Sequence, residues 1–300
     1  MDLWIIATLS AAFFQTLRFM LQKHLSTHAL SAAGSTFARF VFAAPVVVAL
    51  TLGYGALTRS AVPAIGAGFV PFAIAGGAAQ ILATVCVVVL FKHRNFAVGI
   101  TFKKTEVIQT ALAGFLILGE GVSMAAVFAI VIGLLGVLVL SDMPAVSGGM
   151  LRRMLNRATG LGLLSGAFFA VSAVCYRGAS LEVGSADPLL RAGVALSFVV
   201  LFQVALLGLY LRLRERGEIM RTLAAWRVAG WVGMTSMAGS LSWFTAFTLM
   251  NAAYVNALGQ VELIFALLAS TLFFKEKITT REVFGITLIS LSVLVLIRVL

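Results

Sequence analysis

The chain has 300 residues, of which 61% are hydrophobic and 11% are charged, whereas soluble domains carry about a quarter charged residues. This composition excludes an ordinary water-soluble protein and indicates an integral membrane protein. The formal net charge of +11 does not indicate nucleic-acid binding, because Lys and Arg stand in short clusters between apolar runs.

Ten apolar runs approach the roughly 20 residues that a helix needs to cross a bilayer. The first run starts at Leu3 with no positive segment before it, so we interpret it as a membrane helix and not as a cleavable signal. In chain order, the expected helices cover residues 3–21, 33–53, 66–91, 96–118, 122–141, 158–178, 188–211, 228–249, 252–274 and 281–299. No run has the alternating rhythm of a membrane β-barrel, so the sequence predicts an all-α membrane protein.

The second half of the chain repeats the first. When residues 95–140 are placed over 251–296, 16 of the 46 positions are identical without a gap, including Glu106 with Glu262 and Glu120 with Glu276. LSAAFF at 9–14 also resembles LSGAFF at 164–169. We therefore predict ten transmembrane helices in two five-helix repeats. Because five is odd, the second repeat enters the bilayer from the opposite side, and the repeats are inverted. The predicted units are a first repeat at 1–141, a basic connecting loop at 142–157 and a second repeat at 158–300.

The distribution of basic residues predicts the orientation. Fourteen of the 22 Lys and Arg residues lie in connections that follow odd-numbered helices. By the positive-inside rule these connections face the cytoplasm, which places both termini outside a cytoplasmic (inner) membrane.

Three short motifs carry a resemblance to a known family. ARFVFAA (38–44) lies in the second expected helix, ILGE (117–120) ends the fourth and FKEKIT (274–279) follows the ninth. In a chain of two five-helix halves, these motifs resemble the EamA-like branch of the drug/metabolite transporter superfamily. The resemblance implies a secondary transporter of small metabolites, often an exporter, with its cavity between the halves. It implies no particular substrate.

The stretch TFKKTEVIQT (101–110) places three charges inside the fourth expected helix. At a rise of ~1.5 Å per residue, Lys103 lies roughly 10 Å below the surface and Glu106 lies near the midplane. The alternative is a re-entrant loop, with a helix that starts only after Thr105. A charge in the bilayer interior costs at least about 2.5 kcal/mol, so it normally faces a cavity or a partner. Lys103 and Glu106 share a helix face and can neutralise each other, whereas Lys104 points about 100° away and has no ready partner on its own helix.

The two halves differ at these positions. The second half keeps Glu262 but has Gly259 and Gln260 where the first half has its lysines, and this asymmetry predicts a substrate that carries a carboxylate or phosphate. We predict that Glu106 and Glu262 are the carboxylates that couple protons, with Glu262 the better carrier because Lys103 lies beside Glu106. The candidate substrate-binding residues are Lys103, Lys104, Arg39, Gln80, Trp243 and Asn256.

Arg39 can serve either to grip a helix end or to line the cavity. Arg191 follows Asp187 by four residues, which favours a local salt bridge, and Glu120 and Glu276 are typical of interfacial anchors. Paired glycines, such as Gly133 with Gly136 and Gly160 with Gly166, are typical of close helix packing.

The residues favour a transporter over an enzyme. The three histidines (His24, His28 and His93) are scattered, and Cys86 and Cys175 lie in apolar runs, so no catalytic, metal or cofactor site is indicated. We predict export of a small anionic metabolite by alternating access between the halves. A flippase for a lipid-linked phosphate carrier is the alternative. The expected partners are a small-molecule substrate, the bilayer and coupled protons, with exchange and uniport left open. We expect a working monomer, because the duplication supplies both halves of the site.

Overall fold

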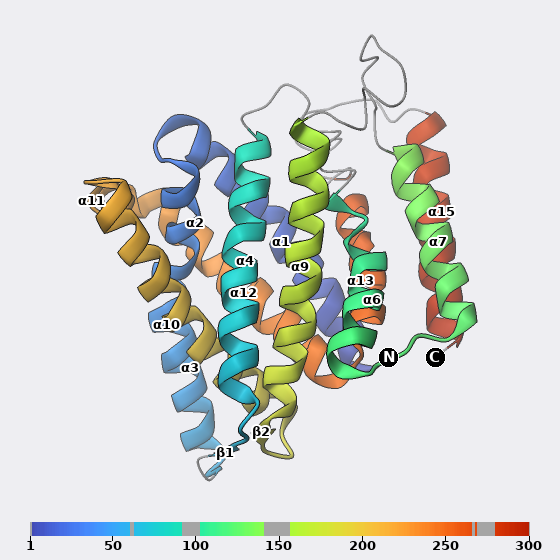
Figure 1. Ribbon diagram of the computed structural model, residues 1–300, viewed down its shortest axis with the longest axis horizontal. Coiled ribbons are helices and arrows are strands. Elements are labelled where there is room, and N and C mark those ends of the chain that lie inside the picture. Colours follow the sequence, from blue (N-terminus) through green and yellow to red (C-terminus); the bar gives the residue numbers. More distant parts are fainter. Residues whose placement is uncertain are drawn as a thin grey trace.

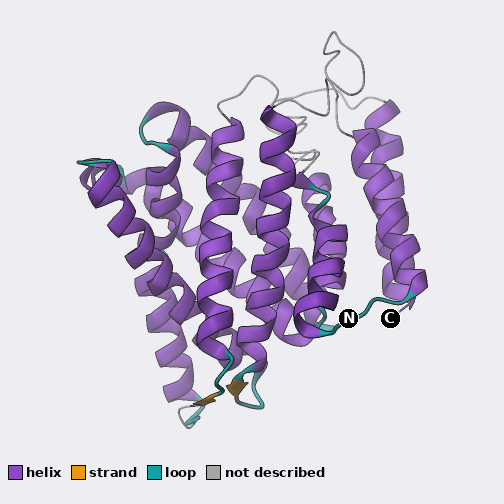
Figure 2. Cartoon of the chain, viewed as in Figure 1, coloured by secondary structure: helices purple, strands orange, loops and turns teal. Residues whose placement is uncertain are grey.

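The computed structural model describes residues 2–60, 63–91, 103–140, 157–265, 268 and 280–299. Nearly all of these residues are helical (Figures 1 and 2). In the first half of the chain the helices are α1 (Leu3–His28), α2 (Ala32–Val41), α3 (Ala44–Leu57), α4 (Phe69–Phe91), α6 (Glu106–Leu118) and α7 (Met124–Leu140). In the second half they are α9 (Arg157–Leu181), α10 (Pro188–Arg214), α11 (Glu218–Ala224), α12 (Trp226–Leu249), α13 (Ala252–Leu258), the 3₁₀ helix η1 (Gly259–Val261) and α15 (Thr280–Val299).

Five helical stretches are long and apolar enough to cross a membrane: Leu3–His28, Ala32–Leu57, Phe69–Leu90, Gly160–Leu181 and Pro188–Arg214. Three shorter apolar helices are Glu106–Leu118, Met124–Gly136 and Val283–Arg298. The protein is therefore a multi-pass membrane protein. The count of ten spans stays a prediction, because 96–102 of the fourth expected helix and most of 266–274 of the ninth lie outside the described residues. Most of the connecting loop at 142–157, FKEKIT and Glu276 also lie outside them.

The second span, Ala32–Leu57, is one helical stretch, as the sequence analysis expected over 33–53, with a local irregularity that separates α2 from α3. Phe42 and Ala43 form a turn between α2 and α3, and Pro45 follows within the first turn of α3. Proline has no N–H to donate to the carbonyl four residues earlier, and its ring clashes with that carbonyl. The bend fits closely against α12, since a Cβ on Gly233 would lie 2.4 Å from the Cβ of Phe42.

The helices pack in matching pairs. In the bundle α4 lies along α9 and α1 lies along α12, while α6 packs on α9, and α13 and η1 pack on α1. A separate pair, α7 and α15, stands at the edge of the bundle (Figure 1). The contact between α7 and α15 is close, because a Cβ on Gly136 would lie 2.9 Å from the carbonyl oxygen of Gly285. Close packing is thus confirmed at Gly133, Gly136 and Gly166, but Gly160 faces open space.

A two-stranded ribbon, which the sequence analysis did not predict, links two connections. Strand β1 (Ala64–Ile65) pairs antiparallel with β2 (Val183–Gly184), with Ala64 opposite Gly184 and Ile65 opposite Val183. The ribbon joins the connection between α3 and α4 to the connection between α9 and α10. It lies at the lower end of the bundle in Figure 1, and both termini lie in the lower half of the same view.

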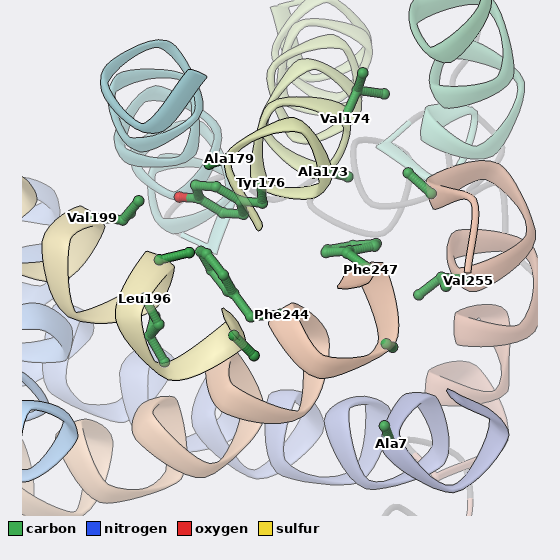
Figure 3. Packing of buried hydrophobic residues seen from close by; sticks show 14 of the residues in the cluster. Ala7, Ala173, Val174, Tyr176, Ala179, Leu196, Val199, Phe244, Phe247 and Val255 are labelled. Carbon is green, nitrogen blue, oxygen red and sulfur yellow. The ribbon is translucent and has the colours of Figure 1, made fainter. Parts of the chain in front are cut away.

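The bundle has apolar groups both on its surface and in its core. Figure 3 shows part of the core, where Tyr176 of α9 meets Leu196 of α10 and Phe244 of α12; the rings of Tyr176 and Phe244 lie 4.3 Å apart between centroids. Large apolar side chains such as Leu116 (71% exposed) face outward, where lipid replaces water as the surrounding solvent. Several charged side chains lie inside the bundle.

Candidate functional site

A small cavity lies between α1, α4, α6, α9, α12 and α13. It is lined by Gln15, Gln80, Lys103, Glu106, Phe169, Ser172, Ala173, Tyr176, Ser240, Trp243, Phe244, Phe247, Asn256, Gly259 and Glu262. Six of the eight predicted site residues are in this lining, and Lys104 and Arg39 are not. The cavity volume of about 40 Å³ holds a few water molecules but not a metabolite.

Lys103 and Glu106 form the predicted pair within one stretch of chain. Lys103 Nζ lies 3.1 Å from a carboxylate oxygen of Glu106, and Lys103 is only 2% exposed. The same ammonium lies 4.7 Å from the centroid of the Phe169 ring, and it faces the ring of Phe19 at 5.9 Å. This buried cation is held by one carboxylate and by aromatic faces.

Lys104 pairs with Glu262, on the other half of the chain. The distance from Lys104 Nζ to Glu262 Oε2 is 2.7 Å, and Gln15 Nε2 donates to the same oxygen at 3.0 Å. The expectation that Glu262 is the carboxylate with less lysine contact is wrong. Spacing along one helix could not show this contact, because the two partners are 158 positions apart.

The backbone breaks at equivalent places in the two halves. Lys104 and Thr105 form a turn, and α6 begins at Glu106, so the fourth helix is not the continuous element that the sequence predicted. Offset by 156 residues, α13 ends at Leu258, η1 follows, and helix resumes at Glu262. A helix break exposes backbone polar groups, and inside a membrane such breaks are tolerated where they are buried in protein or line a cavity.

Trp243 gives a physical reason for the glycine at position 259. A Cβ on Gly259 would lie 2.5 Å from the indole of Trp243, so no side chain fits there without moving the ring. The indole N–H donates to Gln15 Oε1 at 3.1 Å, and its ring stacks on Phe247 at 5.6 Å. Gly259 corresponds to Lys103 in the repeat, so the Trp243 ring occupies the space beside the second-half counterpart of Lys103.

Arg39 lies in the last turn of α2, but its guanidinium does not bond the end of that helix. It donates to three hydroxyl groups, those of Ser236 (2.8 Å), Thr84 (3.0 Å) and Ser240 (3.3 Å). No carboxylate among the described residues forms a salt bridge with it. Arg39 is 3% exposed and stands behind Ser240, which lines the cavity.

The remaining predicted polar residues belong to hydrogen-bond networks. Gln80 Oε1 accepts from the hydroxyl of Tyr176 and from Gln203 Nε2, both at 3.0 Å. Asn256 Nδ2 donates to the hydroxyl of Thr110 at 2.9 Å. These contacts orient Gln80 and Asn256 on the cavity wall.

Sequence reasoning did not single out one polar face of α1. Gln15, Arg18 and Gln22 recur at three and four residues, and this helical spacing inside an apolar run was the available signal. Arg18 is 2% exposed, its Nη1 donates to Gln22 Oε1 at 2.8 Å, and Gln22 donates to the carbonyl of Ser35 at 3.2 Å. Arg18 Nη2 has no hydrogen-bond partner among the described residues.

Two charged residues near helix ends have partners other than those expected. Arg191 and Asp187 do not form the predicted ion pair: Arg191 Nε donates to the carbonyl of Ser180 at 2.9 Å, while Asp187 caps α10 through the N–H of Leu189. A hydrogen bond from the hydroxyl of Tyr54 at 2.6 Å lowers the pKa of Asp187. Glu120 binds Arg177 Nε with both oxygens, at 2.6 and 2.8 Å.

Comparison with known proteins identifies the second half of the chain. Residues 157–298 match the sequence pattern of the EamA-like transporter family. This stretch is an EamA-like transporter domain. The family belongs to the drug/metabolite transporter superfamily, so the resemblance noted in the sequence is confirmed for this stretch. EamA-like proteins are membrane transporters and not enzymes.

A solved crystal structure shares the fold of the whole chain. It superposes with a TM-score of 0.72 over 98% of this chain and 96% of that chain, at 16% sequence identity. The fold of that protein therefore extends over the helices that precede residue 157 as well as over those that follow it. No curated protein sequence matches the chain. Among the residues that the structure describes, no three His, Cys, Asp or Glu side chains form a group that could hold a metal ion.

Proposed function

We propose that this EamA-like protein is a secondary transporter that exports a small anionic metabolite across the cytoplasmic membrane by alternating access between two inverted halves. The observation that carries the proposal is the buried pair Lys104–Glu262, which joins the halves beside the cavity. A charge pair at such a junction can form and break as the halves rock, and it offers a cation to an anionic substrate.

The packing of the helices supports two inverted repeats. In the repeat, α4 corresponds to α12, α6 to α13 and α9 to α1. The contact of α4 with α9 therefore corresponds to the contact of α12 with α1, and the contact of α6 with α9 corresponds to the contact of α13 with α1. Both members of each pair are present. The breaks at Lys104–Thr105 and at η1 are related by the same repeat, as expected for interrupted helices at a central site.

One pair of contacts breaks this symmetry and suggests how the halves alternate. The repeat relates Lys104 to Gln260 and Glu262 to Glu106, so the counterpart of Lys104–Glu262 is Gln260–Glu106. That counterpart is open: neither amide atom of Gln260, which is 2% exposed, has a hydrogen-bond partner among the described residues. If the halves exchange conformations, the Lys104–Glu262 contact is broken in the opposite state and a Gln260–Glu106 contact is formed.

Substrate binding would act on the same contact. An anion that binds Lys104 replaces Glu262 and leaves that carboxylate buried without its cation. A buried unpaired charge is costly, and a proton on Glu262 removes it. The pair thus gives a physical route by which substrate and proton binding are linked, with Glu262 as the coupling group.

Transport by purified protein in liposomes tests the proposal. We expect counterflow of water-soluble organic anions that is lost in Lys104→Ala and partly kept in Lys104→Arg, which preserves the charge. Arg59→Gln, a change of an exposed loop residue, is the matched control. Movement of a labelled isoprenoid phosphate between leaflets, with no anion counterflow, would instead show a lipid flippase. Anion counterflow that is unaffected by Lys104→Ala would contradict the proposed site.

A further inference from the structure

The charges inside the bundle do not sum to zero. Among the described residues around the cavity, four cations are buried (Arg18, Arg39, Lys103 and Lys104), against two carboxylates, those of Glu106 and Glu262; a third buried carboxylate, Glu218 of α11, pairs with Arg221. Each lysine has its own carboxylate. Both arginines have only neutral hydrogen-bond partners among the described residues, so the described site carries two uncompensated positive charges.

Both arginines stand next to the cavity. Arg39 reaches its wall through Ser240. Arg18 lies over the ring of Phe19, 4.1 Å from the centroid, and the cavity-lining Lys103 faces the same ring. Arg18 is also linked through Gln22 to Ser35, which precedes Arg39 by one turn of α2. The Arg39 guanidinium faces α4 and α12, the Arg18 guanidinium lies against Gln22 and Phe19 of α1, and the hydrogen bond from Gln22 to the Ser35 carbonyl connects the two helices that carry them.

Each guanidinium has donors to spare. Arginine carries five N–H donors in a planar fork that fits carboxylate and phosphate. Arg39 uses three of its nitrogens on hydroxyl groups that are themselves free to rotate, and Arg18 Nη2 is buried without a partner among the described residues. A buried cation and an unused buried donor are both unfavourable, and one anionic group relieves both.

We propose that the substrate is an organic dianion whose two charges are balanced by Arg18 and Arg39. This inference rests on the proposed transport function and names its substrate class. The walls formed by Phe169, Trp243 and Phe247 would hold an apolar or planar body. Arg18 and Arg39 balance the two charges of the ligand in the described conformation, and Lys104 exchanges Glu262 for the anion when the halves move.

Thermal unfolding of the purified protein with three probes tests the charge requirement. Phenyl phosphate and terephthalate carry two charges at pH 7.5, and benzoate, which has the same ring, carries one. We expect the dianions to bind at least tenfold more tightly than benzoate, and to raise the melting temperature accordingly. Lowering the pH to 5.5 separates the two sources of charge, because a phosphate monoester gains a proton near pH 6 while carboxylates stay ionised. A rise in melting temperature with only one of the two dianions also supports the inference, and it shows whether the site prefers a phosphate or two carboxylates.

Two variants test the residues. Arg18→Gln and Arg39→Gln should each remove the preference for dianions, and Arg227→Gln, an exposed arginine of α12, should keep it. Without ligand, loss of an unpaired buried charge should leave the melting temperature unchanged or higher, which distinguishes lost binding from lost folding. If a variant does not fold, inhibition of wild-type counterflow by the three probes gives the same comparison. Equal binding of benzoate and the dianions would overturn the inference of a dianionic substrate. In that case, counterflow of benzoate or of a dianion would still support the proposed transport function.

Discussion

The contact between Lys104 and Glu262 predicts a large and strongly non-additive effect on stability. Lys104 is 3% exposed, and its ammonium lies 2.7 Å from the carboxylate. Removal of one partner of a buried ion pair costs about 3–5 kcal/mol, because the other charge stays buried without compensation. In Lys104→Met, Glu262 keeps the hydrogen bond from Gln15, so we expect the lower end, about 3 kcal/mol. In Glu262→Gln the ammonium keeps no charged partner at this distance, and we expect about 4 kcal/mol.

The double variant should be far more stable than the sum of the two single changes. With both charges gone no uncompensated ion remains, and replacement of a buried pair by neutral groups is often close to neutral. We therefore expect a coupling free energy of at least about 2 kcal/mol. The assay is reversible unfolding in mixed detergent micelles, with free energies compared over the four proteins of the cycle. Arg59→Gln should change the free energy of unfolding by less than about 0.5 kcal/mol. Effects of the two changes that add to within about 0.5 kcal/mol would refute the inference that this contact holds the halves together.

Three further predictions concern other contacts. Gly259→Ala should destabilise the protein by about 1–3 kcal/mol, because its Cβ would meet the Trp243 indole; a Trp243→Phe background should relieve the cost, and equal melting shifts in both backgrounds would argue against the clash. Arg177→Gln should cost about 1–2 kcal/mol in the same unfolding assay, since it removes the two-oxygen pair with Glu120, and no loss would show that the pair contributes nothing. Tyr54→Phe should raise the pKa of Asp187 toward its usual value. Because the folded-state pKa lies below the ordinary value of 3.8, the ionised carboxylate of the wild type gives its full stabilisation at pH 7, and this is lost as the pH falls below 3.8 through the folded-state pKa. The melting temperature of the variant should therefore be lower than that of the wild type at pH 7, and this difference should shrink below pH 3.8; a difference that stays constant from pH 7 to 3 would contradict the prediction.

The sequence predicted the features that depend on composition and local spacing. The long apolar runs predicted the membrane helices. The gap-free repeat with an offset of 156 residues places the backbone break at Lys104–Thr105 opposite the break at η1. The Lys103–Glu106 pair was predictable because both residues share one helix face.

The contacts that were not predicted join residues that are distant in the chain. The sequence analysis looked for a partner of Lys104 on the same helix, and no residue near Lys104 in the sequence indicates a contact with Glu262. The local turn at Phe42–Ala43 was not predicted, although Pro45 was the available signal, because the run is apolar throughout. The significance of Arg18 depends on which buried cations lack a carboxylate, and that is a property of the packed structure.

The ribbon of β1 and β2 has a mechanical consequence. It stitches the two halves together through peptide groups, and peptide groups are the same in every residue except proline. Side chains still limit substitution there, because Val183 is buried and a Cβ on Gly184 would lie 3.2 Å from the carbonyl oxygen of Ala64. If the halves rock as proposed, a motion that parts the bundle at this end must first break the pairing of β1 with β2, whichever substrate is bound.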